Sequence, residues 1–287
     1  MAFGWVMIFA LISMLGWGFT DFFVQRSARK VGDVETLAFI VVIGTIAFFP
    51  FIIGELPLLL IPENFALLVV LGIVAFAAAI INFEALREGK LSVIDVIFEI
   101  ELPVTVLLAF VFFGEVFSMI QFFLVICVLI GIVLIATKSF KHWRTRLEKG
   151  VLLAFIAAIL MGCTNFLIAT SARQVSPLVA VWFSWVLVAV LCLVIIARKK
   201  TLNLFVRNFW RYKWLMLIMA FADLTAWILY SLALVENELW IVTAITESYP
   251  AVALILGVKL NKEKAKKHQY LGALIALVAC ILLGLSI

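Results

Sequence analysis

Charged residues are scarce in this chain of 287 residues: they make up 14% of it, whereas 67% of the residues are hydrophobic. Soluble domains are roughly one quarter charged and half apolar, so this composition excludes an ordinary soluble protein. Long polar stretches are also missing, which leaves no connection long enough to fold as a separate soluble domain. The apolar runs show too little alternation for barrel strands. The sequence therefore predicts an all-α integral membrane protein.

Histidine and cysteine are rare as well, with two and four copies. His142 and His268 lie in basic connections, and no metal-binding, phosphate-binding or nucleophile motif surrounds them. All four cysteines fall inside apolar runs, where small sulfur side chains usually pack, so neither a disulfide framework nor metal-ligand spacing is present. We expect no enzymatic activity, no metal and no cofactor.

What the chain has instead is a series of apolar runs of about 20 residues, the length with which a helix crosses a ~30 Å hydrocarbon layer. We predict ten transmembrane helices, over residues 3–25, 35–54, 65–87, 91–113, 118–137, 150–172, 177–197, 213–235, 239–259 and 268–286. The first run has no Lys or Arg at its start and exceeds the usual signal-peptide core, so we expect it to remain as the first helix.

The chain also contains an internal repeat. Residues 18–29, with Gly-Phe-Thr-Asp-Phe at the start and Ser-Ala-Arg at the end, reappear in altered form as residues 162–173. Because an odd number of predicted helices separates the two copies, the halves 1–143 and 144–287 must enter the membrane in opposite directions. The sequence thus predicts two inverted five-helix repeats that form one transmembrane domain. Many carriers use such halves to open one central site alternately to the two sides of a membrane.

Positive charge lies almost entirely on one side of the predicted bundle. Of the 22 Lys and Arg residues, 21 fall in the connections after the odd-numbered helices, and Arg173 is the exception. The positive-inside rule places these connections in the cytoplasm. We interpret the basic stretches 138–149 and 198–213 as topology signals and contacts with anionic membrane lipids, and not as a nucleic-acid site. The prediction is a multi-pass protein of the cell membrane with both termini outside the cytoplasm.

Acidic residues inside the apolar runs are the main site candidates, because ionisable groups at membrane depth usually face the bundle interior or a wet cavity. With a rise of ~1.5 Å per residue, Asp21 lies toward the cytoplasm, Glu101 and Asp223 near the midplane, and Glu247 toward the outside. Glu99 lies between the depth of Asp21 and that of Glu101 and Asp223. No Lys or Arg is comparably deep, so these acids must be protonated, hydrogen-bonded or matched by a cationic ligand. This pattern points to protons or cationic substrates.

Glu99 and Glu247 form the pair of greatest interest, because the later parts of the two halves align with an offset of 148 residues that places one on the other. Each precedes a proline of its helix, Pro103 or Pro250. A proline frees the carbonyl group four residues earlier from its helical bond, and freed acceptors beside acids suit a binding cavity. The alternative is that these acids are neutral helix contacts and that the prolines only kink their helices.

Three further residues complete the candidate set. Asn165 stands where the repeat of Asp21 would be, which either reserves proton chemistry for the first half or shows that an amide suffices for packing. Trp17 and Trp227 lie deeper than tryptophans of the membrane interface. They are candidates for lining a pocket or holding a cation over their rings, although core packing is the alternative for each.

Several short motifs, recurring at matching places in both halves, resemble EamA-type members of the drug/metabolite transporter superfamily. They are Trp17-Gly18, Pro103 and Gly114-Glu115 followed by Gln121, with Gly162, Pro250, Glu263 and Gln269 in the second half. The resemblance implies a carrier of small metabolites, often an exporter, with a central cavity between the halves. Family members usually have cytoplasmic termini, so this chain would be inverted relative to them. Met161 and Lys262 also depart from the pattern, since they replace the second Trp and the glycine before Glu263.

The preferred hypothesis is a secondary active transporter, an exporter, that moves a small polar or amphipathic metabolite by alternating access, with proton coupling through the intramembrane carboxylates. Two alternatives stay open. One is a facilitative uniporter whose acids only bind the substrate. The other is a non-transporting membrane sensor or assembly subunit whose polar residues are structural. The expected partners are a small-molecule substrate, protons and lipids.

Overall fold

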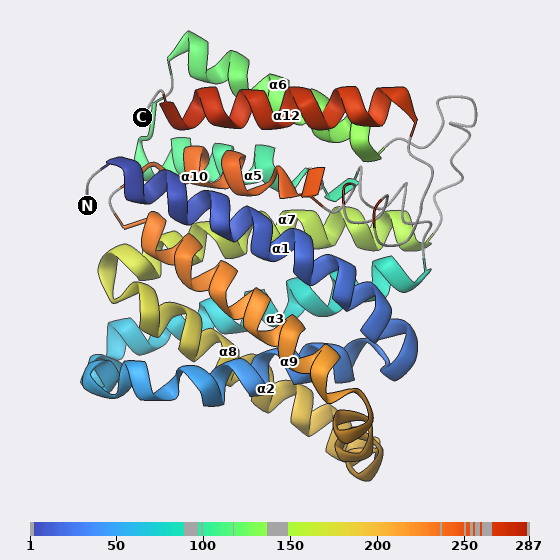
Figure 1. Cartoon of the computed structure of the whole chain (residues 1–287). Helices are drawn as coiled ribbons and strands as arrows, with labels where there is room; N and C mark the ends of the chain where they lie inside the picture. Colours follow the sequence, from blue (N-terminus) through green and yellow to red (C-terminus); the bar gives the residue numbers. More distant parts are fainter. Residues whose placement is uncertain are drawn as a thin grey trace.

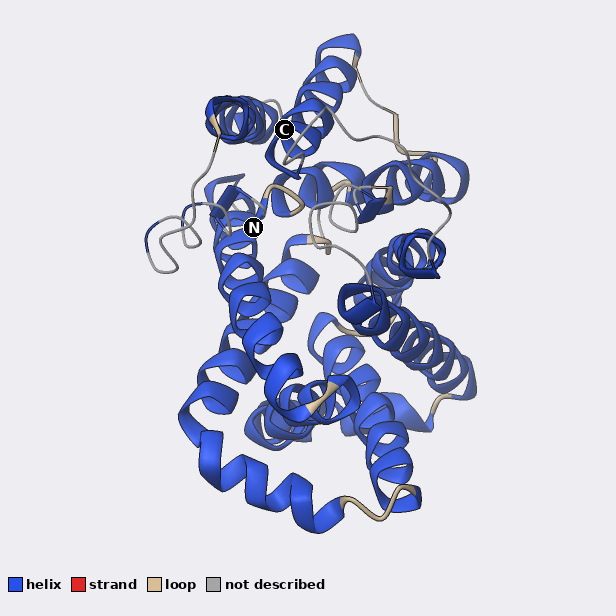
Figure 2. Ribbon diagram, turned by 90° about the vertical axis from the view of Figure 1, so that its right-hand side faces the viewer, coloured by secondary structure: helices blue, strands red, loops and turns tan. Residues whose placement is uncertain are grey.

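The computed structural model consists of helices joined by short loops and turns in the part of the chain that it describes, and no strand occurs there (Figures 1 and 2). The structure describes residues 3–88, 97–98, 100–116, 118–136, 149–235, 237–249, 251–252, 255, 259 and 266–285. Among the predicted site residues, Glu99 and Pro250 lie outside this set, and so does the side chain of Asp21.

Each predicted apolar run overlaps a helical element. The elements of the first half are α1 (Phe3–Val31), α2 (Asp33–Ile52), the 3-10 helix η1 (Ile53–Leu60), α3 (Pro62–Glu88), α5 (Glu101–Leu108), the π-helical turn η2 (Ala109–Phe113) and α6 (Met119–Ala136). Those of the second half are α7 (Lys149–Gln174), α8 (Pro177–Arg198), α9 (Leu202–Ala233), α10 (Leu239–Thr246) and α12 (Lys267–Leu285).

Five helical segments of the described chain are long and apolar enough to cross a membrane. They are Asp33–Leu60, Pro62–Ala85, Leu152–Gln174, Pro177–Arg198 and Leu202–Ala233. Shorter apolar helices cover Trp5–Thr20, Glu101–Phe113, Met119–Leu134 and Lys267–Leu283. The all-helical membrane architecture is therefore confirmed, while the number of ten spans stays a prediction.

The start of α9 differs from its predicted position at residue 213. The helix begins at Leu202 and is kinked at Tyr212, where φ is −121° and ψ is 23°. Within the added segment Phe205 is buried and stacks on Phe39 of α2, with ring centroids 4.2 Å apart, and Phe209 lies 6.1 Å from the same ring. This segment is an amphipathic helix whose apolar face packs on the bundle, and its basic residues are the reason that the sequence did not predict it.

The packing of the helices follows the internal repeat. Helix α1 packs along α9 of the other half. In the same manner α7, the equivalent of α1, packs along α3, the equivalent of α9. In the same way α3 contacts α8, and α9 contacts α2. Helices α6 and α12, which are each other's equivalents, lie side by side at one end of the molecule, whereas α2 and α8 lie together at the opposite end (Figure 1). Exchanging the halves thus reproduces the same set of neighbours.

The repeated glycines show the same relation at atomic detail. A Cβ atom on Gly18 would lie 2.7 Å from Cβ of Val252, and one on Gly162 would lie 2.6 Å from Cγ1 of Val104. Val104 and Val252 are 148 positions apart, which is the offset between the later parts of the halves. Both glycines therefore allow α1 and α7 to approach equivalent helices more closely than any larger residue would.

Candidate functional site

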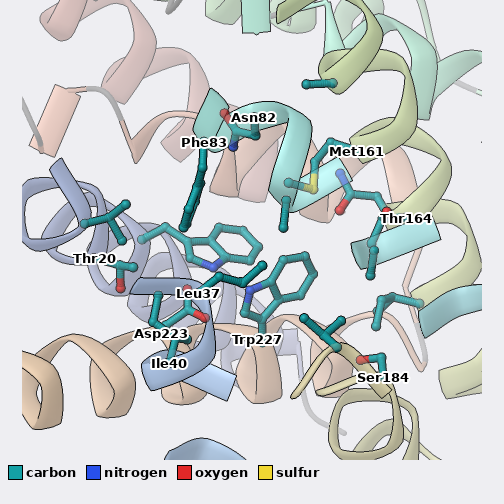
Figure 3. Close-up of a pocket in the computed structure, with 18 of the residues that line it drawn as sticks. Thr20, Leu37, Ile40, Asn82, Phe83, Met161, Thr164, Ser184, Asp223 and Trp227 are labelled. Atoms are coloured by element: carbon teal, nitrogen blue, oxygen red, sulfur yellow. The ribbon is translucent and has the colours of Figure 1, made fainter. Parts of the chain in front are cut away.

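A cavity of about 170 Å³ lies between the two repeats, lined by α1, α2, α3, α5, α7, α8, α9 and the segment that follows α10 (Figure 3). Its walls include pairs of positions that the repeat makes equivalent, such as Thr20 with Thr164. Other pairs have diverged: Ala75 and Ala79 of α3 correspond to Asp223 and Trp227 of α9. The cavity thus lies where the halves meet, and its two walls are equivalent in position and different in chemistry.

Most of the predicted site residues that the structure describes come together at this cavity. Its lining includes Trp17, Glu101, Asn165, Asp223, Trp227 and Glu247. Pro103 is exposed and does not line it. Glu247 follows the last residue of α10 and is only 6% exposed. Acids from three different helical segments therefore face one space.

Asn165 supplies the amide that holds one of these acids. Its Nδ2 donates hydrogen bonds to Oε1 of Glu101 at 2.7 Å and to Oγ1 of Thr105 at 3.4 Å, which joins α7 to α5. Asn165 is 1% exposed, so its amide donates to groups inside the protein and not to solvent. An ionised aspartate cannot donate, and so the residue at the repeat of Asp21 has a definite chemical role as an amide.

Aromatic rings form the wall beside Asp223. Trp17 of α1 and Trp227 of α9 meet edge to face with ring centroids 4.9 Å apart, and Tyr230 lies 5.2 Å from Trp17. The Tyr230 hydroxyl is bound to that of Thr243 at 2.8 Å. Figure 3 shows Trp227 beside Asp223, one helical turn away on α9. The two tryptophans pack against each other and line the cavity at the same time.

Two lining residues that the sequence reasoning missed have unpaired polar atoms. Thr20 is 4% exposed, and neither its hydroxyl oxygen nor the side-chain carbonyl oxygen of Asn82 has a hydrogen-bond partner. Both side chains are among those drawn around the cavity in Figure 3. An indication was present in the sequence, because Thr20 belongs to the repeated segment and Asn82 is a polar residue within an otherwise apolar run.

A second polar cluster, at the end of α7, joins the two halves outside the cavity. Nη2 of Arg173 lies 2.8 Å from Oε1 of Glu115, which is 8% exposed, and Nε donates to the carbonyl oxygen of Leu234 at 3.0 Å. The guanidinium also lies over the Phe113 ring, 4.3 Å from its centroid. In the sequence Arg173 stood out only as the exception to the one-sided distribution of Lys and Arg, whereas in the structure it connects η2, α7 and the segment after α9.

Known proteins place this architecture in a family. The model of the EamA-like transporter family matches residues 4–137 and 148–285, one copy in each half. The chain belongs to the EamA-like transporter family. A solved structure described only as "Crystal structure of protein" aligns with a TM-score of 0.78 over 98% of this chain and 96% of that one. Its sequence identity of 15% limits the likeness to the fold. The chain matches no curated protein.

Membership confirms the resemblance to the drug/metabolite transporters and makes this protein a multi-pass membrane protein of a transporter family, which implies a small-molecule substrate. The family is one of transporters and not of enzymes. Within the described residues of this EamA-like transporter, no group of His, Cys, Asp or Glu side chains could hold a metal ion.

The motif Gly114-Glu115 with Gln121 has structural roles in this EamA-like transporter. Gly114 ends η2 in the left-handed conformation, with φ of 65°. The backbone N–H of Ser118 donates to Gln121 Oε1 at 2.8 Å, and the Gln121 N–H donates to the Ser118 hydroxyl at 3.2 Å, which is a capping box at the start of α6. At the equivalent place before α12, the Lys266 N–H donates to Gln269 Oε1 at 2.9 Å.

Proposed function

We propose that this protein is a secondary active carrier, an exporter, that moves a small polar or amphipathic metabolite by alternating access. The observation that supports this function best is the cavity at the junction of the repeats, lined by equivalent positions of both halves. In carriers built from inverted repeats, one half rocks against the other around such a fixed central site. The access path then changes side while the binding residues stay the same.

Proton coupling is the second part of the proposal. Glu101, Asp223 and Glu247 line the cavity, and its described lining includes no Lys, Arg or His. An ionised carboxylate is costly to bury, and this cost favours binding of a proton or a cationic ligand at such a site. We assign proton binding to Glu247 together with its equivalent Glu99, and expect loading and release of protons to alternate with those of the substrate.

The test uses purified protein in proteoliposomes with an imposed pH gradient and a panel of candidate metabolites. Wild-type protein should transport a member of the panel at a rate that depends on the gradient. Glu247→Gln should retain binding and lose this dependence, because the amide cannot release a proton. Glu63→Gln is the matched control, since Glu63 is exposed in the first turn of α3.

Each other outcome decides against a part of the proposal. Unchanged transport and pH dependence in Glu247→Gln would show that the assigned coupling is wrong. Transport without proton movement would favour a uniporter. Absence of uptake, efflux and ligand-dependent stabilisation over the whole panel would favour a sensor or assembly subunit.

We also propose that both termini lie outside the cytoplasm, the orientation that the one-sided distribution of Lys and Arg favours. The Arg173 cluster would then be on the external side. A reporter fused after Ile287 should be active only outside the cytoplasm, and cytoplasmic activity would refute the orientation.

A further inference from the structure

The start of α9, Leu202–Tyr212, is a short helical segment that lies across one end of the bundle. We propose that this segment binds anionic phospholipids of the surrounding membrane, with Arg207 and Arg211 holding their phosphate groups. The inference goes beyond the proposed function and does not depend on it, because it concerns the outer surface of the protein. The course of the segment, its apolar face and its positive charges each support it.

The kink at Tyr212 turns the Leu202–Tyr212 segment away from the rest of α9. The segment begins just after α8 ends at Arg198, and in Figure 1 it is seen nearly end-on at the lower right, whereas α2 and α7 run across the picture. Figure 2, turned by 90°, shows it along the lower edge of the molecule. Because Asp33–Leu60 and Leu152–Gln174 are long and apolar enough to cross the membrane, a helix perpendicular to them runs parallel to the membrane surface.

One face of this segment is apolar and exposed, beside the face that packs on the bundle. The packed face includes Phe205 and Phe209, which lie against the Phe39 ring of α2. A spacing of four residues places a second row on the adjoining face, and its members are between 48% and 67% exposed: Leu202, Val206 and Trp210. Such a row is costly to expose to water, whereas at the surface of a bilayer it contacts acyl chains. The segment therefore fits the boundary between headgroups and hydrocarbon.

The third row of the segment is polar and positively charged. It consists of Asn203, Arg207 and Arg211, all exposed, and positions 202–222 contain no Asp or Glu. Nζ of Lys30, from the end of α1, and Cζ of Arg211 lie 5.1 and 5.4 Å from the centre of the Tyr212 ring. Within the described part of the chain, Arg207, Arg211 and Lys30 form no ion pair with an acid. Like charges one helical turn apart repel each other, so an anion bound between them is stabilising.

Two features favour a phospholipid over a soluble anion. The cationic row adjoins the apolar row, so a ligand that matches both carries a phosphate group and an acyl chain. Exposed indoles also accompany the cations: Trp210 precedes Arg211, and Nζ of Lys213 lies 5.5 Å from the centre of the Trp214 ring. Exposed indoles are typical of the headgroup level of a membrane. Glycerol phosphate would occupy the cationic row and leave the apolar row in water.

Thermal unfolding of the purified full-length protein in a neutral detergent tests the ligand. The probes are dioctanoyl phosphatidylglycerol, dioctanoyl phosphatidylcholine and glycerol phosphate. We expect the anionic lipid to raise the melting temperature at least about twice as much as the zwitterionic lipid, and this difference to shrink at high salt. An equal rise with both lipids would overturn the preference for an anionic headgroup. A rise with glycerol phosphate equal to that with the anionic lipid would overturn the lipid as the ligand.

Two double variants test the residues in proteoliposomes, where brominated lipids of each headgroup quench the fluorescence of Trp210. The Trp210 signal is obtained by comparison with Trp210→Phe in the same background. Arg207→Gln with Arg211→Gln should lower the preference for the anionic lipid about tenfold, since each basic side chain near the surface attracts anionic lipids.

Lys266→Gln with Lys267→Gln is the matched control, because it removes two exposed charges at the start of α12 and should leave the preference at Trp210 unchanged. Thermal unfolding without added lipid verifies that each variant is folded. A preference that is unchanged in the arginine variant, or lowered equally in both variants, would overturn the assignment of Arg207 and Arg211. Absence of any quenching of Trp210 would show that the segment does not lie at the membrane surface.

Discussion

Arg173→Met should destabilise the protein more than any other removal of an exposed or half-exposed positive charge. The substitution leaves the Glu115 carboxylate, which is 8% exposed, without the guanidinium 2.8 Å away. Breaking a buried ion pair by removing one partner costs about 3–5 kcal/mol. Because the Arg173 side chain is 25% exposed, solvent screens part of the interaction, and we expect the lower end of that range, about 3 kcal/mol.

The remaining variants of this cluster separate its contributions. Glu115→Gln should cost less, about 1–2 kcal/mol, because the guanidinium keeps the carbonyl oxygens of Leu234 and Asn237 as acceptors. The double variant Arg173→Met with Glu115→Leu should cost less than the sum of its parts, since no buried charge is left unpaired.

The assay is urea unfolding of the purified protein in detergent, followed by circular dichroism. Arg207→Met is the matched control, since Arg207 is exposed on α9, and it should stay within about 0.5 kcal/mol of the wild type. The reasoning would be refuted by an Arg173→Met variant as stable as this control. Additivity of the two single substitutions would likewise show that the pair is not coupled.

Three further predictions concern other parts of the bundle. Gly162→Ala should lower the free energy of unfolding by about 1–3 kcal/mol through overpacking, because a Cβ there would lie 2.6 Å from a side-chain atom of Val104 in α5. Gly54→Ala is the control for the same urea assay and should be neutral, because a Cβ at Gly54 meets nothing within 4 Å. Asn165→Asp replaces the amide donor with a second acid beside Glu101, so the loss of thermal stability should grow as the pH rises and the new acid ionises. A loss that is equal at all pH values would contradict the role of Asn165 as a hydrogen-bond donor to Glu101. Burial raises the pKa of the Glu238 carboxyl, in the connection before α10, so its ionisation opposes folding as the pH rises. Glu238→Gln should therefore raise the melting temperature more at pH 8 than at pH 4, and the reverse order would show that the sign is wrong.

The helices and their pairing were predictable because both depend on patterns that are local or repeated. Apolar runs of membrane length predict helices, and the repeat of Gly18 in Gly162 predicts equivalent contacts. The start of α9 was missed because Arg207 and Arg211 lower the hydropathy of a segment that still has an apolar face.

The candidate site was predictable only in part. Acids and tryptophans inside apolar runs are conspicuous, and Glu101, Asp223, Trp17 and Trp227 do face one cavity. Whether a polar atom within a helix has a partner depends on neighbouring helices, which no local pattern specifies. For that reason Asn82 was indistinguishable in the sequence from a hydrogen-bonded helix contact.

The divergence between α3 and α9 has a consequence for how this protein could evolve. The two equivalent helices now differ in chemistry, since Asp223 and Trp227 present an acid and an indole to the cavity while Ala75 and Ala79 present only methyl groups. Enlarging either alanine would exclude bulky compounds and leave the acid and the indole in place. Substitutions on α3 would thus change the size of the cavity independently of the acidic and aromatic groups that α9 contributes to it.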